Sequence, residues 1–167
     1  MQVRRLAASD APAYRPLRLR ALREHPEAFT SSHEENLSLP LAETEKRLAS
    51  ATISMWGAFQ AGVLCGAIGL ERETRIKNRH KASLVAMYVA PEHAGLGVGR
   101  ALVDALVREA RTEGLELLVL TVTAGNASAT HLYESAGFRS FGIEPRAIKV
   151  DGQAFAKNHM YLELSPR

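Results

Sequence analysis

The chain has 167 residues, of which 46% are hydrophobic and 23% charged, with a formal net charge of +3. This composition is typical of a globular domain with a sizeable core, and the small positive charge does not by itself indicate nucleic-acid binding. The single cysteine excludes an internal disulfide, and no apolar run approaches the roughly 20 residues that span a bilayer. We therefore expect one domain over residues 1–167, located in the cytoplasm, with neither nucleic acid nor membrane as a partner.

The amino-terminal part predicts a short strand followed by a helix. Residues 2–6 alternate in the manner of an edge strand, and Ser9 and Asp10 are good residues for a helix start. Pro16 lacks the amide that a helix interior requires, so we expect a kink or a break near it. The second part, residues 17–24, carries three arginines that we interpret as a solvated face: Arg18, Arg20 and Arg23.

A polar loop or short turn follows at residues 26–35, and a second helix is predicted over 41–49. Residues 54–60 and 63–73 then predict an antiparallel hairpin. The basic stretch at 74–81 fits either a solvated turn or an electrostatic lure for an anionic ligand.

A predicted strand at 82–90 leads into a turn with glycine at alternate positions, namely Gly95, Gly97 and Gly99. A helix is predicted over 98–112, because apolar residues recur on one face and Gly114 can end it. Glycines let the backbone approach a ligand closely, and the first amides of a helix have no intrahelical partner. The turn therefore predicts a site for phosphate oxygens.

Two common phosphate motifs do not fit this turn. Gly99 is followed by Arg100 and Ala101, whereas a P-loop requires Lys and then Ser or Thr. Neither possible frame completes the dinucleotide fingerprint, and residues 121–123 lack the acidic residue that would bind a ribose. An oxidoreductase or another nucleotide-binding α/β protein is therefore disfavoured.

The next stretch, residues 116–123, is almost continuously apolar, as in an interior strand. A strand, a helix and a strand of these lengths predict a right-handed crossover between parallel strands. After it, Asn126 is a good helix cap, and Tyr133 lies seven residues further on, on about the same helix face. That face borders the carboxyl ends of the parallel strands, where α/β sheets bind ligands.

The two segments resemble signatures of the GNAT N-acetyltransferase superfamily. The first, Q/R-x-x-G-x-G/A, begins at Ala94, which departs from the usual Gln or Arg, and continues through Gly97 and Gly99. The second, N-x-x-A-x-x-x-Y-x-x-x-G-F, is matched throughout by Asn126, Ala129, Tyr133, Gly137 and Phe138. The tail is also similar, with a predicted hairpin at 142–152 and a last strand at 160–164.

The resemblance implies an α/β, or α+β, single-domain GNAT-like fold. Its sheet would be mixed and mostly antiparallel, with a central parallel pair splayed around the cofactor and helices on both faces. The implied activity is transfer of an acetyl group from acetyl-CoA to a primary amine, by direct attack in a ternary complex and without a metal ion. A non-catalytic acyl-CoA sensor of the same fold is the alternative.

The resemblance also implies roles for particular residues. The pantetheine would lie along the strand residues Met87, Tyr88 and Val89, and Asn126 and Ala129 would border it. Tyr133 would protonate the departing thiolate. The pyrophosphate would be held by the turn residues Ala94, Gly95, Leu96, Gly97, Val98, Gly99 and Arg100.

An attacking amine must be neutral, so a general base is also expected. The best candidate is Glu71, on the strand beside the central one, with Glu73 in reserve. Further candidates lie in the polar loop: His33, Glu34 and Glu35. Cys65 could in principle carry the acetyl group, but a cysteine within an apolar run is typically a small core residue.

The acceptor is left open by the sequence, as a small-molecule or a peptide amine. Its pocket is expected in the variable parts, around residues 29–35 and the hairpin at 144–153. The oligomeric state is open as well, because many relatives dimerise but no motif in this chain requires a homodimer.

Overall fold

The computed structural model describes residues 1–164, which form one seven-stranded sheet in the order β1-β2-β3-β4-β5-β7-β6. Neighbouring strands are antiparallel except β4 and β5. The strands are β1 (Gln2–Arg5), β2 (Ile53–Gln60), β3 (Val63–Arg72), β4 (Lys81–Val89), β5 (Leu117–Thr123), β6 (Arg139–Val150) and β7 (Gln153–Glu163). The helices are α1 (Ala11–Glu24), α2 (His33–Leu37), α3 (Leu41–Leu48), α4 (Val98–Thr112) and α5 (Ala127–Ser135), with short 3-10 turns η1 (Ala8–Asp10), η2 (Pro26–Ala28) and η3 (Pro91–His93).

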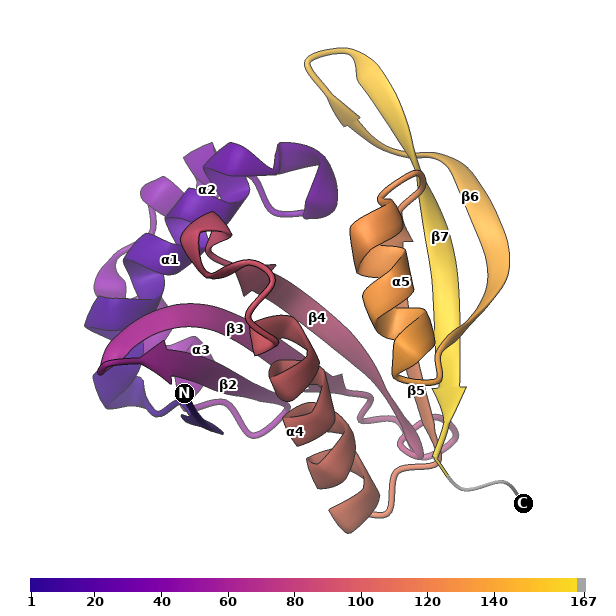
Figure 1. Ribbon diagram of the computed structural model, residues 1–167, viewed down its shortest axis with the longest axis horizontal. Helices are drawn as coiled ribbons and strands as arrows, with labels where there is room; N and C mark the ends of the chain where they lie inside the picture. The colour runs from indigo at the N-terminus through magenta and orange to yellow at the C-terminus, as the bar shows by residue number, and fades with distance from the viewer. Residues whose placement is uncertain (165–167) are drawn as a thin grey trace.

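The parallel pair stays together only at its beginning. β4 and β5 are in register at three positions, Lys81–Leu117, Ala82–Leu118 and Ser83–Val119, and beyond these the strands separate (Figure 1). Their separation coincides with a bulge in β4, where the register with β3 shifts and Ala86 takes a φ of +55°. A bulge bends its strand, and here the parted strands confirm the predicted splay.

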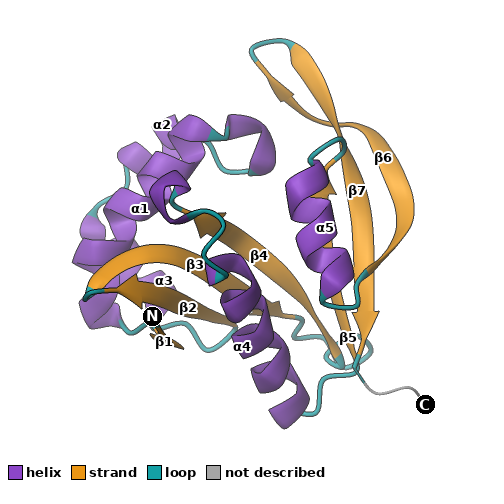
Figure 2. Cartoon of the chain, viewed as in Figure 1, coloured by secondary structure: helices purple, strands orange, loops and turns teal. Residues whose placement is uncertain are grey.

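Helices cover both faces of the sheet, as predicted (Figure 2). The apolar faces of α4 and α5 pack into the larger core cluster, around Leu102, Leu106 and Tyr133. The other cluster lies under α1 and α3 and includes Tyr14, Leu17 and Leu48. No helix among residues 1–164 is both long and apolar enough to cross a membrane.

Three local predictions need correction. Helix α1 runs unbroken through Pro16, because its buried residues Leu17 and Ala21 hold it against the sheet despite the missing amide. Residues 26–35 contain η2 and the start of α2, whose capping box joins Ser32 and Glu35. The last strand begins at Gln153 rather than at residue 160, since β6 and β7 form one long hairpin.

Candidate active site

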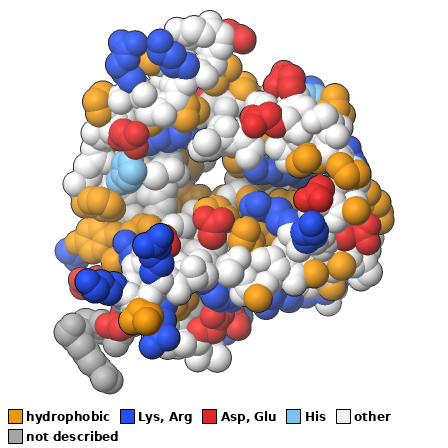
Figure 3. All heavy atoms as spheres, turned by 180° about the vertical axis from the view of Figure 1, so that it is seen from behind, with side chains coloured by type: hydrophobic (Ala, Val, Ile, Leu, Met, Phe, Trp, Pro, Cys, Tyr) orange, Lys and Arg blue, Asp and Glu red, His pale blue; other side chains and the backbone are white. Residues whose placement is uncertain are grey.

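A cavity of about 760 Å³ lies where β4 and β5 part, within the usual size range of ligand pockets. One wall comes from α5 and the start of α4, and the other from α1, η2 and the end of β3. Figure 3 shows a deep opening at the centre of the molecule, with basic and acidic side chains around it. The opening is a consequence of the parting strands, because two paired strands would leave no such space.

The structure brings nearly all of the sequence-predicted residues to this cavity. Leu96 does not line it and is 59% exposed at the tip of the turn. The predicted residues that do line it are Glu71, Met87, Tyr88, Val89, Ala94, Gly95, Gly97, Val98, Gly99, Arg100, Asn126, Ala129 and Tyr133.

The glycine turn presents free amides to the cavity. Gly95 and Gly97 have φ values of +77° and +80°, which side chains rarely adopt. Helix α4 begins at Val98, and its first backbone bond runs from the Ala101 amide to the Gly97 carbonyl at 3.1 Å. The amides of residues 98–100 therefore have no intrahelical acceptor, at the positive end of the helix dipole. This arrangement suits the oxygens of a phosphate.

Gly99 has a different reason to be glycine. A Cβ atom at this position would lie 3.1 Å from Leu132 Cδ2 and 3.3 Å from Met87 Cε. These atoms are the ends of flexible side chains, so an added Cβ would make the two side chains move by a few tenths of an ångström where α4, α5 and β4 meet. The side chain of Arg100 turns away to bind Asp104 and the Ser135 carbonyl, at 2.9 and 3.1 Å. Its contribution to the cavity is therefore that of its backbone.

An ion-pair network fixes the approach to the turn. Arg20 donates two hydrogen bonds to Glu92 at 2.6 and 2.7 Å, and a third to Glu24 at 3.0 Å. These bonds lower the pKa of Glu92 to about 2. The Tyr88 hydroxyl donates a hydrogen bond to Glu24 at 2.7 Å. Burial, together with this carboxylate, raises the pKa of Tyr88 to about 12. The Tyr88 hydroxyl is thereby held against α1.

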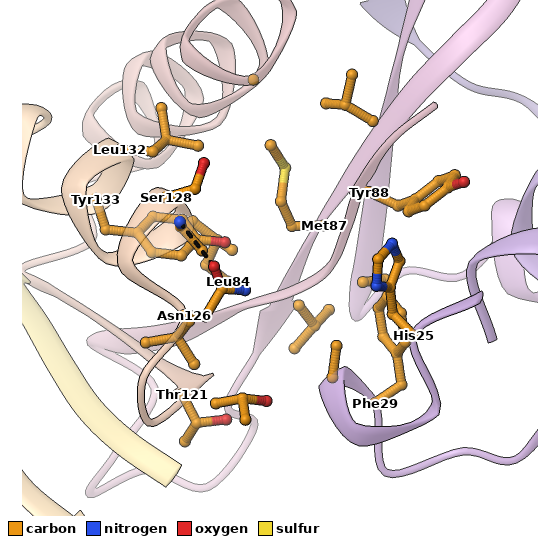
Figure 4. Close-up of a pocket in the computed structure, with 18 of the residues that line it drawn as sticks. His25, Phe29, Leu84, Met87, Tyr88, Thr121, Asn126, Ser128, Leu132 and Tyr133 are labelled. Carbon is orange, nitrogen blue, oxygen red and sulfur yellow. Dashed lines mark hydrogen bonds between the residues drawn. The ribbon is translucent and has the colours of Figure 1, made fainter. Parts of the chain in front are cut away.

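Asn126 and Tyr133 stand together on α5 (Figure 4). The Asn126 Oδ1 atom accepts a hydrogen bond from the Ala129 amide at 3.1 Å and so caps the helix. Tyr133 is 5% exposed, and its ring packs edge-on against Phe138 with centroids 5.9 Å apart. Burial raises the pKa of the Tyr133 phenol. The phenol therefore stays protonated at neutral pH and can act as a hydrogen-bond donor.

The candidate general bases differ in whether they line the cavity. Glu71 lies near the end of β3, is exposed, and lines the cavity. Glu73 lies outside the lining and accepts a hydrogen bond from Asn78 Nδ2 at 3.3 Å. His33 and Glu34 are not in the lining either, and Glu35 serves the cap of α2. Glu71 is therefore the only one of these candidates with access to the cavity.

Cys65 is a core residue, as expected from its apolar neighbours. Its side chain is 1% exposed, and its Sγ atom donates to the Ala58 carbonyl at 3.4 Å. Burial raises the pKa of the thiol, which disfavours the reactive thiolate. The residue also does not line the cavity.

The interpretation of the arginines on α1 as a solvated face is wrong for two of the three. Arg20 is tied to Glu92, and Arg18 lies over the Phe29 ring, 5.0 Å from its centre, in the wall of the cavity. Only Arg23 is exposed. A signal was present in the sequence, because Arg18 lies four residues after Tyr14 and one after Leu17, on the apolar stripe of the helix.

Further lining residues were not anticipated from the sequence. Arg47 of α3, His25 and Thr121 all reach the cavity. Residues 29–31 line it as expected, but no residue of the hairpin at 144–153 does. This side of the cavity is formed by α1, η2 and α3 rather than by that hairpin, because β6 and β7 extend past the cavity (Figure 1).

The fold and the cavity define an α/β protein with its ligand site at the point where neighbouring strands separate. A model of the acetyltransferase (GNAT) family matches residues 18–138. The chain belongs to this family.

Two curated relatives share about a third of their matched residues with this chain. One is an L-methionine sulfoximine/L-methionine sulfone acetyltransferase of Pseudomonas paraeruginosa, 32% identical over 81 residues, which are 48% of this chain and 47% of the relative. The other is the L-amino acid N-acyltransferase MnaT of Escherichia coli, 33% identical over 82 residues, 49% and 48% of the two chains. The matches thus span about half the length of these relatives.

Among solved structures, that of yncA from Salmonella typhimurium with its cofactor acetyl-CoA superposes with a TM-score of 0.83. The alignment covers 100% of this chain and 95% of the other, at 24% sequence identity. At that identity the likeness establishes the shared fold.

Proposed function

We propose that the protein transfers the acetyl group of acetyl-CoA to a primary amine by direct attack in a ternary complex. The amine nitrogen attacks the thioester carbonyl carbon and forms the new C–N bond. The C–S bond then breaks, the nitrogen loses a proton, and the CoA thiolate gains one. The products are an N-acetylated amine and CoA, so the protein would be an acyltransferase that moves groups other than aminoacyl groups.

One observation carries this proposal: the free amides at the start of α4 and the phenol of Tyr133 open into the same cavity. One elongated ligand could therefore place its diphosphate on those amides and its thioester near that phenol. The parted strand β4 lies between them, with Met87 and Val89 available along the way. No observation on the described residues favours the non-catalytic sensor.

In this proposal the turn residues 95–100 hold the pyrophosphate, and Asn126 borders the pantetheine. Tyr133 donates to the sulfur, and Glu71 accepts the proton of the amine. Residues 1–167 act as one N-acetyltransferase domain in the cytoplasm. The names of the two curated relatives make amino acids and their analogues the first acceptors to test.

The test has a binding arm and a turnover arm. Titration calorimetry with CoA measures binding, and release of free thiol from acetyl-CoA measures turnover across amino acids, peptides and polyamines. We expect CoA to bind and at least one amine to accelerate thiol release far above the rate without amine. Absence of CoA binding, or binding without amine-dependent release, would refute the proposal.

A further inference from the structure

Two arginines in the cavity wall have no anionic partner among the described residues. Arg18, on α1, forms neither an ion pair nor a hydrogen bond with the described residues, and its guanidinium lies over the ring of Phe29. Arg47, on α3, also lacks an ion pair, and its Nε atom is buried without a hydrogen-bond partner. In contrast, Arg4, Arg20 and Arg72 each bind a carboxylate with at least two hydrogen bonds.

The two side chains are also close enough to repel. Burial is the main cause that lowers the pKa of the Arg18 guanidinium; the charge of Arg47 lowers it further, and Tyr14 acts in the opposite direction. The Tyr14 hydroxyl belongs to the same neighbourhood, and it is buried without a hydrogen-bond partner. Arg18 and Arg47 are both partly buried, and a partly buried charge without a partner, beside a like charge, destabilises a fold unless another group compensates it. The arrangement therefore fits an anion that comes from outside the chain.

The candidate general base lies on the face of the sheet that α1 and α3 cover. Glu71 is paired with Ile53 across β3 and β2, and Ile53 packs in the cluster beneath α1 and α3. Residues directly opposite each other in a sheet share a face, so Glu71 points toward the side that carries the two arginines. The two arginines and Glu71 therefore lie on one side of the cavity, whose lining also includes Glu27.

We propose that Arg18 and Arg47 bind the carboxylate of the acceptor, which makes the acceptor a small molecule with an amine and a carboxylate together, an amino acid. This inference rests on the proposed acetyl transfer and specifies its substrate. The guanidinium groups would pair with the carboxylate, and the amine would lie on the Glu71 side. Guanidinium groups bind carboxylates well because their planar donors match both oxygens.

The experiment compares acceptors that differ only in the carboxylate. Methionine is tested against methionine amide and 3-(methylthio)propylamine, and phenylalanine against phenylalanine amide and phenethylamine. The readout is the ratio of kcat/KM for the acid to that for its amide, measured on one preparation. Loss of folded protein cancels in this ratio, so a variant that folds poorly still reports on recognition.

We expect the parent to favour the acid in at least one series, and Arg18→Gln or Arg47→Gln to lower the ratio by about 10- to 100-fold, mainly through KM of the acid. Arg18→Lys should retain part of the preference. Arg23→Gln, an exposed arginine on the same helix, should leave the ratio unchanged. The affinity for CoA should be the same in all variants.

Three results would overturn the inference. The first is an acid-to-amide ratio near one in the parent, and the second is a preference that survives both glutamine variants. The third is a loss of CoA affinity in those variants, which would assign the arginines to the phosphates of the cofactor. If none of these acceptors releases CoA but a polyamine or a peptide does, the acceptor class fails while acetyl transfer stands. If no amine of any class releases CoA although CoA binds, the acetyl-transfer proposal itself fails.

Discussion

At the scale of single residues, the two proposed proton-transfer groups differ in their surroundings. Tyr133 is buried, and its pKa is raised, so it is held in the protonated form. Glu71 is exposed near the end of β3 and lines the cavity, where a bound amine could reach its carboxylate. Tyr133 is therefore held as the donor that its proposed role requires, and Glu71 lies where an acceptor of the amine proton would be needed.

Replacing Tyr133 by Phe should lower kcat by about 100-fold, the usual scale of help from one general acid. The effect is limited because a CoA thiolate, whose conjugate acid has a pKa of about 8.5, is already a fair leaving group. The CoA dissociation constant should stay nearly the same, since only the hydroxyl is removed. Equal turnover in parent and variant, measured by thiol release, would exclude the acid role.

Replacing Glu71 by Gln should lower kcat/KM for the amine at neutral pH and make it rise with pH. A lysine-like amine has a pKa of about 10.4, so without a base only its small neutral fraction reacts. Measured pH–rate profiles should therefore approach each other at high pH. Glu73→Gln is the matched control and should follow the parent, because that carboxylate lies outside the cavity. A parent-like profile for Glu71→Gln would eliminate this base.

At the scale of elements, the proposed binding of the cofactor phosphates depends on the backbone geometry of the turn between η3 and α4. It holds two glycines with positive φ and the free amides of a 15-residue helix. Arg20 of α1 anchors it through Glu92. Its shape thus depends both on local backbone freedom and on a contact with a distant helix.

Replacing Gly97 by Ala should weaken CoA binding by about tenfold. The new Cβ meets no atom within 4 Å, so the substitution costs only backbone strain at a φ of +80°, about 1–2 kcal/mol. The turn relieves this strain by changing its backbone angles, which moves its amides. Gly62→Ala is the matched control, with the same φ and equally open space in the turn between β2 and β3. It should lose similar stability but bind CoA normally. If calorimetry gives equal affinities, the turn geometry does not hold the cofactor.

The pairing of Glu92 with Arg20 should contribute to acid sensitivity. The pKa of Glu92 is lowered from its ordinary 4.5 to about 2 in the folded protein. Its stabilising contribution is therefore complete above about pH 4.5 and is lost as the pH falls toward 2. Glu92→Gln should flatten the fall of the unfolding free energy in that window, as followed by urea titration at several pH values. An unchanged slope would show that the pair contributes no stability.

At the scale of the whole molecule, the sheet is divided by its own cavity. Beyond three paired positions, β4 and β5 share no register, so the two halves rely on other contacts. One of these is Lys157 of β7, which is 5% exposed and donates to the Glu27 carbonyl at 2.8 Å and to Thr123 Oγ1 at 3.2 Å. A ligand lying in the gap would add further contacts between the halves.

Acetyl-CoA should therefore raise the melting temperature strongly. At 100 times the dissociation constant the gain is about 2.7 kcal/mol, or about 5–10 °C for a chain of this size. Thermal unfolding with increasing acetyl-CoA measures it. Gly97→Ala should need a higher concentration for the same shift. An unchanged melting temperature at saturating acetyl-CoA would contradict binding to the folded state.

The sequence by itself determined the order of the elements and the residues that line the proposed cofactor side of the cavity. Glycines at fixed spacing, an Asn cap and a Tyr two turns later are local signals, because each one acts through the backbone of its own segment. The helix over 98–112 and the hairpin of β2 and β3 were predicted for the same reason. Such local signals can be interpreted from the sequence without knowledge of the tertiary contacts.

Only the tertiary structure decided which charged residues line the proposed acceptor end of the cavity. Arg18 and Arg20 stand on one helix two residues apart, yet one turns to the cavity and the other to Glu92. Arg47 comes from a different helix, α3, and the pairing of β2 with β3 places Glu71 on the same side of the sheet. Whether a charge is solvated, paired or left free depends on partners distant in the chain. The fold supplies these partners, and local sequence carries no record of them.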